Sequence, residues 1–293
     1  MLWTTYGIVG PTAGGKTFIA EKLSTTGKFV IINADSQQIY DYLPTLSSMP
    51  KNLPENHVLY GIAKHGDDFN VARWAVHAHE EIAKAHTSGK VPVLVGGTGL
   101  YFKTLQDGIV SLPEISNDVR TRVADFSLGE LHEHVSEDYA ARIHDRRRLE
   151  KAAAVFIETG KYVEEWHNGP RELRLDGLKL FGLIPERSKV VDNIHARLDR
   201  DFDAMIEEVR ASDLDDIDMI GYHDLKRLQT RPELYDEVKQ LMLYRTRQYA
   251  KRQVTYMRNC LQLEETYDCA NKLYEKVQQA ENDAVNAENP PEF

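Results

Sequence analysis

Cysteine is almost absent from this 293-residue sequence, and long apolar runs are missing. The two cysteines, Cys260 and Cys269, are too few for a disulfide scaffold or a structural zinc site. No stretch of about 18 consecutive apolar residues occurs, and the N-terminus lacks a basic segment followed by an apolar one. We therefore expect two free thiols, no membrane partner and a cytoplasmic protein.

Positive charge is also scarce, because 36 Lys and Arg face 46 Asp and Glu, for a net charge of -10. This balance argues at first against a nucleic-acid partner, since phosphate binding depends on basic side chains that displace counterions. The acidity is uneven, however. Residues 264–293 hold eight acids and two lysines, a net charge of -6, which leaves -4 for the rest of the chain. The average charge therefore says little about the rest of the chain.

The sequence does contain apolar runs typical of buried strands, at 6–9, 29–32, 58–62 and 91–95. Helical periodicity lies between or after them, at 16–23, 71–85 and 99–105. Strands that alternate with helices favour an α/β fold with a parallel sheet core flanked by helices. Ligands of such a sheet bind beyond the carboxyl ends of its strands.

A change of pattern divides the chain further. From 113 to 176 only helical periodicity is visible, as in 140–157, which ends at Thr159-Gly160. The apolar run 178–184 then returns to the sheet, and helices are predicted at 190–209 and 232–259. We expect four parts: the first part of the core over 1–112, an inserted all-helical domain over 113–177, the second part of the core with a basic C-terminal helix over 178–263, and an acidic, partly disordered tail over 264–293.

The segment Gly10-Pro11-Thr12-Ala13-Gly14-Gly15-Lys16-Thr17 matches the phosphate-binding pattern GxxxxGK[ST] between a predicted strand and a predicted helix. Its glycines let successive amides point at a polyphosphate on the positive end of the helix. Lys16 adds charge for the outer phosphate oxygens, and the Thr17 hydroxyl can bind Mg²⁺. A glycine turn without a ligand is the alternative, which the order of strand, loop and helix disfavours.

The usual second half of a nucleotide site is missing. A P-loop NTPase normally has another apolar strand that ends in a metal-binding Asp, whereas 91–95 runs into Gly96-Gly97-Thr98-Gly99. Only the strand 29–32 leads to a carboxylate, Asp35. We expect Asp35 to face the phosphate loop across the mouth of the site and to act as a base on an acceptor. Read alone, this Asp could equally begin a turn or cap a helix.

Four motifs, in this order, resemble the bacterial tRNA dimethylallyltransferases, also called tRNA isopentenyltransferases. They are residues 10–17, Asp35-Ser36-Gln37-Gln38-Ile39-Tyr40, 96–101 and 246–253, within a similarity that runs from about residue 6 to residue 259. The resemblance implies a P-loop core with an inserted helical domain. It also implies transfer of a dimethylallyl group from dimethylallyl diphosphate to the exocyclic amine of the adenosine immediately 3′ of the anticodon, without consumption of ATP.

The same resemblance implies roles for individual residues. Residues 10–17 and Mg²⁺ would hold the diphosphate, with Lys16 at the leaving group, while Asp35 would take the amine proton and Thr98 would lie near the reacting centre. The residues implied in tRNA binding are Asp35, Ser36, Gln37, Gln38, Thr98, Arg120, Arg147, Arg148, Lys151, Arg247, Lys251 and Arg252. The implied partners are the tRNA anticodon stem-loop and dimethylallyl diphosphate, and we expect a monomer.

Basic residues support an RNA partner in one helix. Residues 239–263 contain six basic side chains and no acid, with Tyr244, Tyr249 and Tyr256 between them. Cations and rings along a helix suit phosphates and stacked loop bases, although a solvated helix face is the alternative. A second basic run lies at 142–151, inside the insertion.

Some positions depart from the family pattern. Ser47-Ser48-Met49-Pro50 stands where the family has Gly-Thr-Ala-Lys, and Arg147 stands where it has Gln. Asp201 occupies a position that is usually Arg, which leaves Arg197 or Arg200 to serve in its place.

Other functions stay open on the sequence alone. A P-loop small-molecule ATP-dependent kinase would use Asp35 on a substrate hydroxyl and the arginines 146–148 as a lid over ATP, but it needs no basic, tyrosine-bearing helix. An RNA-binding module with a vestigial P-loop would not need Lys16, Thr17 and Asp35. A transferase that acts on free adenine nucleotides would not need the basic helix.

Overall fold

The computed structural model describes residues 4–67, 69–167, 169–215 and 217–288. The chain divides into two compact units, one formed by Met1–Gln106 with Leu175–Phe293 and the other by Asp107–Arg174. The inserted unit begins and ends a few residues before the expected 113–177. The reason is a short antiparallel ribbon, β5 (Ile109–Val110) paired with β6 (Arg171–Glu172), which belongs to the insertion.

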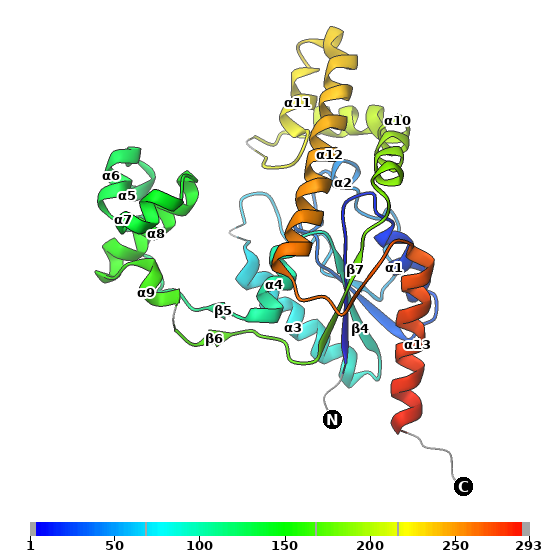
Figure 1. The fold of residues 1–293 in the computed structure, drawn as a ribbon. Coiled ribbons are helices and arrows are strands. Elements are labelled where there is room, and N and C mark those ends of the chain that lie inside the picture. Colours follow the sequence, from blue (N-terminus) through cyan, green and yellow to red (C-terminus); the bar gives the residue numbers. More distant parts are fainter. Residues whose placement is uncertain (1–3, 68, 168, 216, 289–293) are drawn as a thin grey trace. The chain divides into compact units, whose positions relative to one another are not determined.

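A six-stranded parallel sheet forms the centre of the first unit, with the strand order β3-β2-β4-β1-β7-β8 (Figure 1). Its strands are β1 (Thr5–Val9), β2 (Phe29–Asn33), β3 (His57–Val58), β4 (Val91–Gly96), β7 (Leu178–Leu183) and β8 (Glu265–Tyr267). All of β1 and nearly all of β4 are buried. Helices cover both faces of the sheet, which explains why these strands are continuously apolar. The predicted α/β class with a P-loop type of core is confirmed.

Helices pack on the two faces of this sheet (Figure 1). On one face, α1 (Lys16–Ser24) and α13 (Ala270–Glu288) share a buried apolar cluster with the strands, in which Leu23 and Leu273 are fully buried. On the other face lie α3 (Val71–Thr87) and α4 (Gly99–Asp107). There Trp74 stacks on Tyr101 with ring centroids 4.1 Å apart.

A second group of helices completes the first unit: α2 (Pro44–Ser47), α10 (Arg187–Ala211), α11 (Tyr222–Arg227) and α12 (Tyr235–Cys260), the last preceded by η2 (Pro232–Leu234). The buried side chains of α10 recur every three or four residues, so one stripe of the helix faces the cluster. Phe202, Tyr222 and Met242 are central members of that cluster. This helical group positions the side chains that close the site described below.

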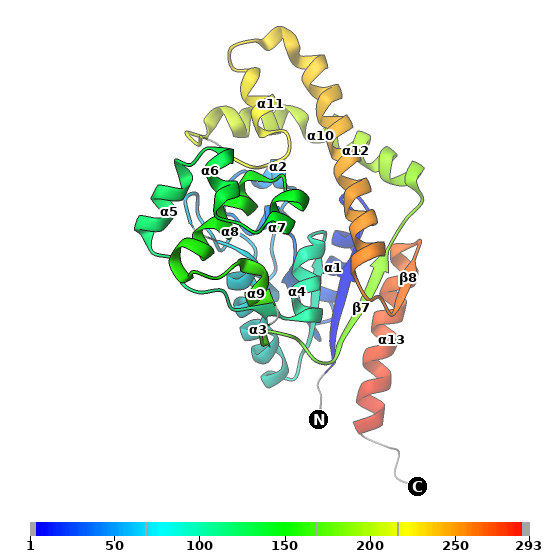
Figure 2. The ribbon, with the colours of Figure 1, turned by 60° about the vertical axis from the view of Figure 1, so that its left-hand side comes forward.

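The inserted unit contains five helices packed around α8 (Arg146–Thr159) (Figure 2). The other four are α5 (Asn117–Ala124), α6 (Leu128–Glu133), α7 (Glu137–Arg142) and α9 (Val163–His167). Side-chain oxygens of Ser116, Ser127, Ser136 and Asp145 cap four of them, as is typical of helix starts. The expectation of an all-helical insertion is corrected by the two-stranded ribbon at its base.

Three local expectations differ from the structure. The strand expected at 58–62 ends at Val58, because Leu59 takes a left-handed φ of +63°. The single helix expected at 140–157 is two helices, since Asp145 accepts a hydrogen bond from the Arg148 amide at 2.9 Å and starts α8 anew. Within the expected tail 264–293, residues 265–288 form β8, which pairs with β7, and α13, which packs on α1, while residues 289–293 lie outside the described part of the chain.

Both cysteines are free thiols. Among the described residues, no helix combines the length and the apolar character that crossing a membrane requires.

Candidate active site

The phosphate loop, residues 10–17, follows the carboxyl end of β1 and leads into α1. Gly15 precedes the helix with a φ of +97°, and Ala13 also takes a left-handed φ of +57°. At Gly10, a Cβ would lie 2.6 Å from the carbonyl oxygen of Leu183, so no side chain fits. Thr17 is exposed in the first turn of α1. The loop therefore has the shape and the place at a helix N-terminus that anion binding requires.

Lys16 folds back over this loop. Its Nζ donates hydrogen bonds to the carbonyl oxygens of Gly10, at 2.9 Å, and Pro11, at 2.7 Å. Burial lowers the pKa of Lys16 to about 8, and the negative charge of Asp35 opposes this shift only in part. Lys16 is thus held inside the site as a cation whose charge an anionic ligand would stabilise.

Asp35 lies two residues beyond the end of β2 and is held by Asn33. The Asn33 Oδ1 accepts a hydrogen bond from the Asp35 amide at 2.9 Å, and its Nδ2 donates to the Asp35 carbonyl at 3.1 Å. The Asp35 carboxylate accepts a hydrogen bond from the Gln37 amide at 3.1 Å and caps η1 (Ser36–Gln38). Asp35 therefore does cap a helix, the alternative considered from the sequence, and its carboxylate still faces the site.

Thr98 connects the turn after β4 to the turn after β2. Its Oγ1 accepts a hydrogen bond from the Ser36 amide at 2.8 Å and donates to the Ser36 Oγ at 3.2 Å. The turn is close-packed, because a Cβ on Gly96 would lie 1.9 Å from the carbonyl oxygen of Ala34. Since β2, β4 and β1 are neighbours in the sheet, Asp35, Thr98 and the phosphate loop meet at one edge.

The electrostatics of Asp35 reflect this enclosure. Burial raises the pKa of the Asp35 carboxyl, whereas the charge of Lys16 and the Gln37 amide favour the ionised form and oppose the shift. The charge of Arg197 acts in the same direction as Lys16. A carboxylate held in this way is more basic than an exposed one, which suits a proton acceptor.

Gln253 is a side chain of the candidate site to which the sequence analysis assigned no role. Its Oε1 accepts a hydrogen bond from the Thr12 amide at 2.7 Å, and its Nε2 donates to the Gly97 carbonyl at 3.1 Å. The side chain therefore ties the phosphate loop to the turn after β4. A signal for this role was its spacing on the helix. Gln253 is a polar residue seven positions after Thr246, and both lie on the buried face of a basic helix whose other face is exposed.

The structure distinguishes the two candidate arginines of α10. Arg197 reaches the site, where its Nη1 lies 3.5 Å from the Thr12 Oγ1, and burial lowers the pKa of its guanidinium. Its Nε is buried and has no hydrogen-bond partner among the described residues. Arg200 instead forms a two-pronged ion pair with Asp201, with separations of 2.9 and 2.7 Å, in an exposed position. Arg197 is therefore the arginine available to a ligand.

Asp35 and Arg197 help to line a small cavity of about 40 Å³. Thr12, Asp35, Gln37 and Arg197 give it a polar side. Leu46, Met219, Ile220 and Met242 give it an apolar side, and Tyr249 borders it as well. One end of the cavity thus suits a charged group and the other suits a hydrocarbon, a division that the sequence pattern did not indicate.

The basic residues expected to contact RNA are exposed, whereas Asp35, Ser36, Gln37, Gln38 and Thr98, also expected to do so, are partly buried. Arg247, Lys251 and Arg252 lie on the surface of α12, where the Arg252 guanidinium is 5.9 Å from the centre of the Tyr249 ring. Two other basic residues of the same helix are engaged within the protein, Lys239 with Asp199 and Arg245 with Asp224, each at 2.8 Å. In the inserted unit, Arg120 on α5 and Arg147, Arg148 and Lys151 on α8 are also exposed.

The structure brings Asp35 and Thr98 close to residues 10–17, which include Lys16, as the sequence predicted. Ser36 and Gln37 lie beside them, and the Gln38 side chain turns away to donate hydrogen bonds to the carbonyls of Ser47 and Ser48. The residues of the insertion that are expected to bind RNA belong to the second compact unit.

Comparison with known proteins gives a consistent result. The model of the IPP transferase family matches residues 38–260. The tRNA dimethylallyltransferase of Wolbachia pipientis wMel is 30% identical over 284 residues, 91% of this chain and 96% of the relative. The tRNA dimethylallyltransferase of Sphingopyxis alaskensis is 35% identical over 273 residues, 86% of this chain and 89% of the relative.

Two solved structures share the fold. A eukaryotic dimethylallyltransferase described as acting on tRNA superposes with a TM-score of 0.73 at 21% identity, covering 98% of this chain and 79% of that one. A tRNA isopentenylpyrophosphate transferase from Staphylococcus epidermidis superposes with a TM-score of 0.64 at 23% identity. The match covers 96% of this chain and 100% of that one. With the family model matching most of the sequence and the relatives aligned along nearly its whole length, this chain belongs to the IPP transferase family.

Proposed function

We propose that this chain transfers the dimethylallyl group of dimethylallyl diphosphate to the exocyclic amine of the adenosine 3′-adjacent to the anticodon in tRNA, with release of diphosphate. The observation that supports it most is the meeting of the phosphate loop, Asp35 and Thr98 at the carboxyl ends of three neighbouring strands. The relatives are named as tRNA dimethylallyltransferases, which supports a dimethylallyl donor and a tRNA acceptor.

The donor's two ends match the two sides of the cavity. The diphosphate binds the amides of residues 10–17, with Lys16 and Arg197 as its cationic partners. The five-carbon tail lies toward Leu46, Met219 and Met242, which are all buried apolar side chains. The leaving diphosphate gains charge as the carbon–oxygen bond breaks, so fixed cations and amides stabilise the transition state more than the bound donor.

Asp35 is the base of this reaction. The amine nitrogen forms a bond to the allylic carbon, the carbon–oxygen bond of the donor breaks, and the amine proton passes to the Asp35 carboxylate. An adenine amine is a weak nucleophile, so acceptance of its proton during bond formation is useful. The enclosed position of Asp35 also restricts water, which would otherwise hydrolyse the donor.

The residues present fit a magnesium ion shared with the donor. Among the described residues, no three His, Cys, Asp or Glu side chains form a metal-binding group. A Mg²⁺ ion normally keeps several waters and takes phosphate oxygens, with only one or two protein ligands, and the exposed Thr17 hydroxyl can supply one of these. When bound, the ion would neutralise charge on the diphosphate.

Exposed cations carry the RNA side of the proposal. Arg247, Lys251 and Arg252 on α12 bind phosphates of the anticodon stem-loop, and Arg120, Arg147, Arg148 and Lys151 do so from the inserted unit. The target base of a loop is already unpaired, so its extrusion into the site costs about a few kcal/mol.

A direct test incubates the protein with Mg²⁺, unmodified tRNA and either dimethylallyl diphosphate or ATP. Mass spectrometry of the RNA nucleosides should show a dimethylallyl adenosine only with the prenyl donor. ATP turnover without RNA modification would support the small-molecule kinase, which the comparisons do not favour.

A further inference from the structure

A C-terminal segment, residues 265–279, borders the phosphate loop and has no part in the reaction proposed above. It consists of β8 and the first half of α13. β8 lies beyond β7, on the side of β1 that is away from β4, and α13 runs beside α1 (Figure 1). The family model ends at residue 260 and does not include this segment, so family membership assigns it no role.

The segment touches the end of the phosphate loop at Gly15. A Cβ added to Gly15 would lie 3.5 Å from the Cβ of Ala270, the first residue of α13. The backbone of Gly15, with its left-handed φ of +97°, therefore packs directly against the start of that helix. A larger side chain at position 270 would enter this contact and press on the loop.

Further contacts fix α13 against α1, which begins directly after Gly15. The Lys22 Nζ lies 4.6 Å from the centre of the Phe18 ring on α1 and 5.0 Å from the centre of the Tyr274 ring on α13. It also donates a hydrogen bond to the Asn271 Oδ1 at 3.3 Å. Leu273 is fully buried in the apolar cluster that α1 shares with the strands. The start of α13 is thus held in place beside the loop by both polar and apolar contacts.

The other end of the loop is supported through β7. The Leu183 carbonyl oxygen, at the end of β7, is the atom that leaves no space for a Cβ on Gly10. β8 pairs with this end of β7, and the Ile184 amide donates a hydrogen bond to the Tyr267 carbonyl at 2.7 Å. The C-terminal segment therefore supports Gly10 through β7 and Gly15 by direct contact.

We infer that the C-terminal segment positions the phosphate loop for the diphosphate of the donor, with Ala270 as the positioning residue. A loop held in its binding conformation accepts an anion without first ordering its backbone, so its affinity is higher. The coupling is reciprocal, because a bound diphosphate must then stabilise the docked segment by the same factor. The inference rests on the proposed function for the identity of the donor, whereas inorganic diphosphate tests the coupling without that assumption.

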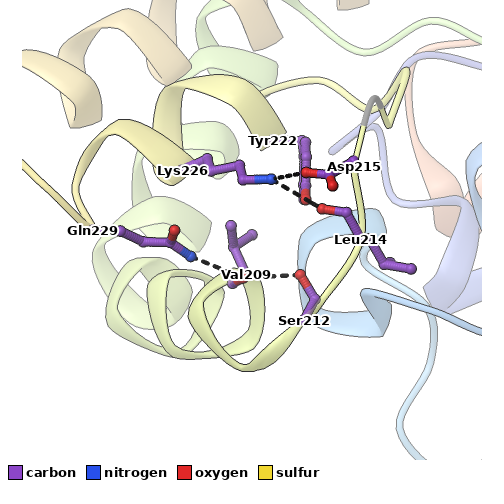
Figure 3. Close-up of polar contacts among 7 residues, drawn as sticks. All are labelled: Val209, Ser212, Leu214, Asp215, Tyr222, Lys226 and Gln229. Atoms are coloured by element: carbon purple, nitrogen blue, oxygen red, sulfur yellow. Dashed lines mark hydrogen bonds and ion pairs between the residues drawn. The ribbon is translucent and has the colours of Figure 1, made fainter.

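The apolar side of the catalytic cavity has a separate support (Figure 3). Met219 and Ile220 line that side. Ahead of them in the chain, the Leu214 carbonyl accepts a hydrogen bond from Lys226 at 3.1 Å, and Asp215 pairs with the same amine at 2.5 Å. The polar and the apolar side of the cavity can therefore be perturbed independently, at position 270 and at position 226.

Calorimetric titration with inorganic diphosphate and with dimethylallyl diphosphate tests the inference. We expect Ala270→Val to weaken both ligands by the same factor, about tenfold, because a β-branched side chain has little freedom to turn away from Gly15. Ala270→Ser, which is barely larger, should bind both as the wild type does. Lys226→Met should weaken the prenyl donor and leave diphosphate unchanged. In steady-state transfer, Ala270→Val should raise the KM for the donor and leave the KM for tRNA unchanged, which a general loss of stability would not do.

Hydrogen exchange of the wild type measures the reciprocal effect and needs no variant. Saturating diphosphate should slow exchange of the amides of residues 270–279, and it should do so more than in α3, which lies on the opposite face of the sheet. Unchanged diphosphate affinity in Ala270→Val, or exchange at 270–279 that diphosphate does not slow beyond that of α3, would overturn the inference and leave prenyl transfer standing. A wild type that shows the coupling but transfers no dimethylallyl group would overturn the proposed function and support the positioning role.

Discussion

At the scale of single residues, the site depends on two ionisable side chains whose charges it holds close together. Burial disfavours the charged form of both Lys16 and Asp35, and each charge partly stabilises the other. Removing either one therefore also changes the protonation of its neighbour, so conservative substitutions and pH profiles are more informative than deletions to alanine.

Replacement of Asp35 by Asn should leave donor and RNA binding nearly intact and lower turnover by about 10² or more, because the amide cannot accept the amine proton. The raised pKa of Asp35 also predicts an acidic limb in wild-type turnover, since activity is lost as pH falls through that pKa and the carboxylate becomes protonated. Single-turnover kinetics against pH measure both effects. Wild-type turnover in Asp35→Asn would remove Asp35 as the base.

Binding of the donor should depend on pH through Lys16. The free protein holds the pKa of Lys16 at about 8, and a bound diphosphate raises it by favouring the protonated amine. Affinity is therefore full below pH 8 and falls as pH rises above it, by up to about tenfold per unit. Calorimetric titration with dimethylallyl diphosphate between pH 7 and about 9.5 should show the decline. Lys16→Arg, which stays charged, should bind with a flat profile; an equal decline in that variant would assign the titration elsewhere.

At the scale of elements, short segments near the site are held by side chains from distant helices. Both carboxylate oxygens of Glu208 on α10 accept hydrogen bonds from the first turn of α2, from the Thr45 amide at 2.8 Å and the Leu46 amide at 2.9 Å. This pair of bonds replaces an N-cap, since Leu43, which precedes α2, provides no side-chain cap. Because Leu46 lines the catalytic cavity, α10 positions part of its apolar side.

Glu208→Ala should therefore destabilise the protein by about 2 kcal/mol, since two amides lose a charged acceptor. Glu208→Gln, which keeps one acceptor oxygen, should cost less. The adjacent Glu207 pairs with Arg210 in an exposed position, so Glu207→Ala should change stability by less than about 0.5 kcal/mol. Urea unfolding of the three variants measures this order, and equal effects at 207 and 208 would contradict it.

At the scale of the whole molecule, residues 265–288 belong to the fold of the first unit. β8 extends the sheet beyond β7, and the side chains of Leu273 and Val277 on α13 are fully buried against α1 and the strands. The acidic side chains of this segment lie on its exposed face. Its apolar side chains, at helical spacing, pack on the first unit and stabilise the segment.

Leu273→Ala should accordingly cost about 2–4 kcal/mol of unfolding free energy, because it leaves a cavity between α13 and α1. Glu275→Ala on the exposed side of the same helix should stay within about 0.5 kcal/mol. Thermal unfolding of the two variants provides the comparison. A Leu273→Ala protein as stable as the wild type would mean that α13 contributes little to the fold.

Although the net charge of the chain is -10, we expect exposed basic residues to bind RNA phosphates. Neutralisation of Arg247 or Lys251 to Gln should weaken tRNA binding and lower the slope of log affinity against log salt by about 1 for each phosphate that is no longer neutralised. Arg210→Gln on α10 serves as the control, since that arginine pairs with Glu207. An unchanged slope in Arg247→Gln and Lys251→Gln would show that neither side chain binds a phosphate.

Sequence reasoning succeeded where the information is local. Residues 10–17 were recognisable because glycine spacing and the strand before it predict a phosphate loop directly, and Asp35 because it alone follows a strand end. Sequence reasoning failed where a single residue interrupts a helix or a strand. Asp145 divides one expected helix into two, and the left-handed backbone of Leu59 ends β3 early. Periodicity averages over such single positions.

By itself, the sequence determined the class of fold, the loop conformation at residues 10–17 and the family, since strand patterning, glycine freedom and motif order are properties of short segments and their succession. Only the tertiary structure decided that Arg197 and not Arg200 enters the site, that Gln253 joins Thr12 across 241 residues of sequence, and that residues 265–288 form sheet and helix. These depend on packing between segments far apart in the chain, and no local pattern specifies which distant side chain fills a given space.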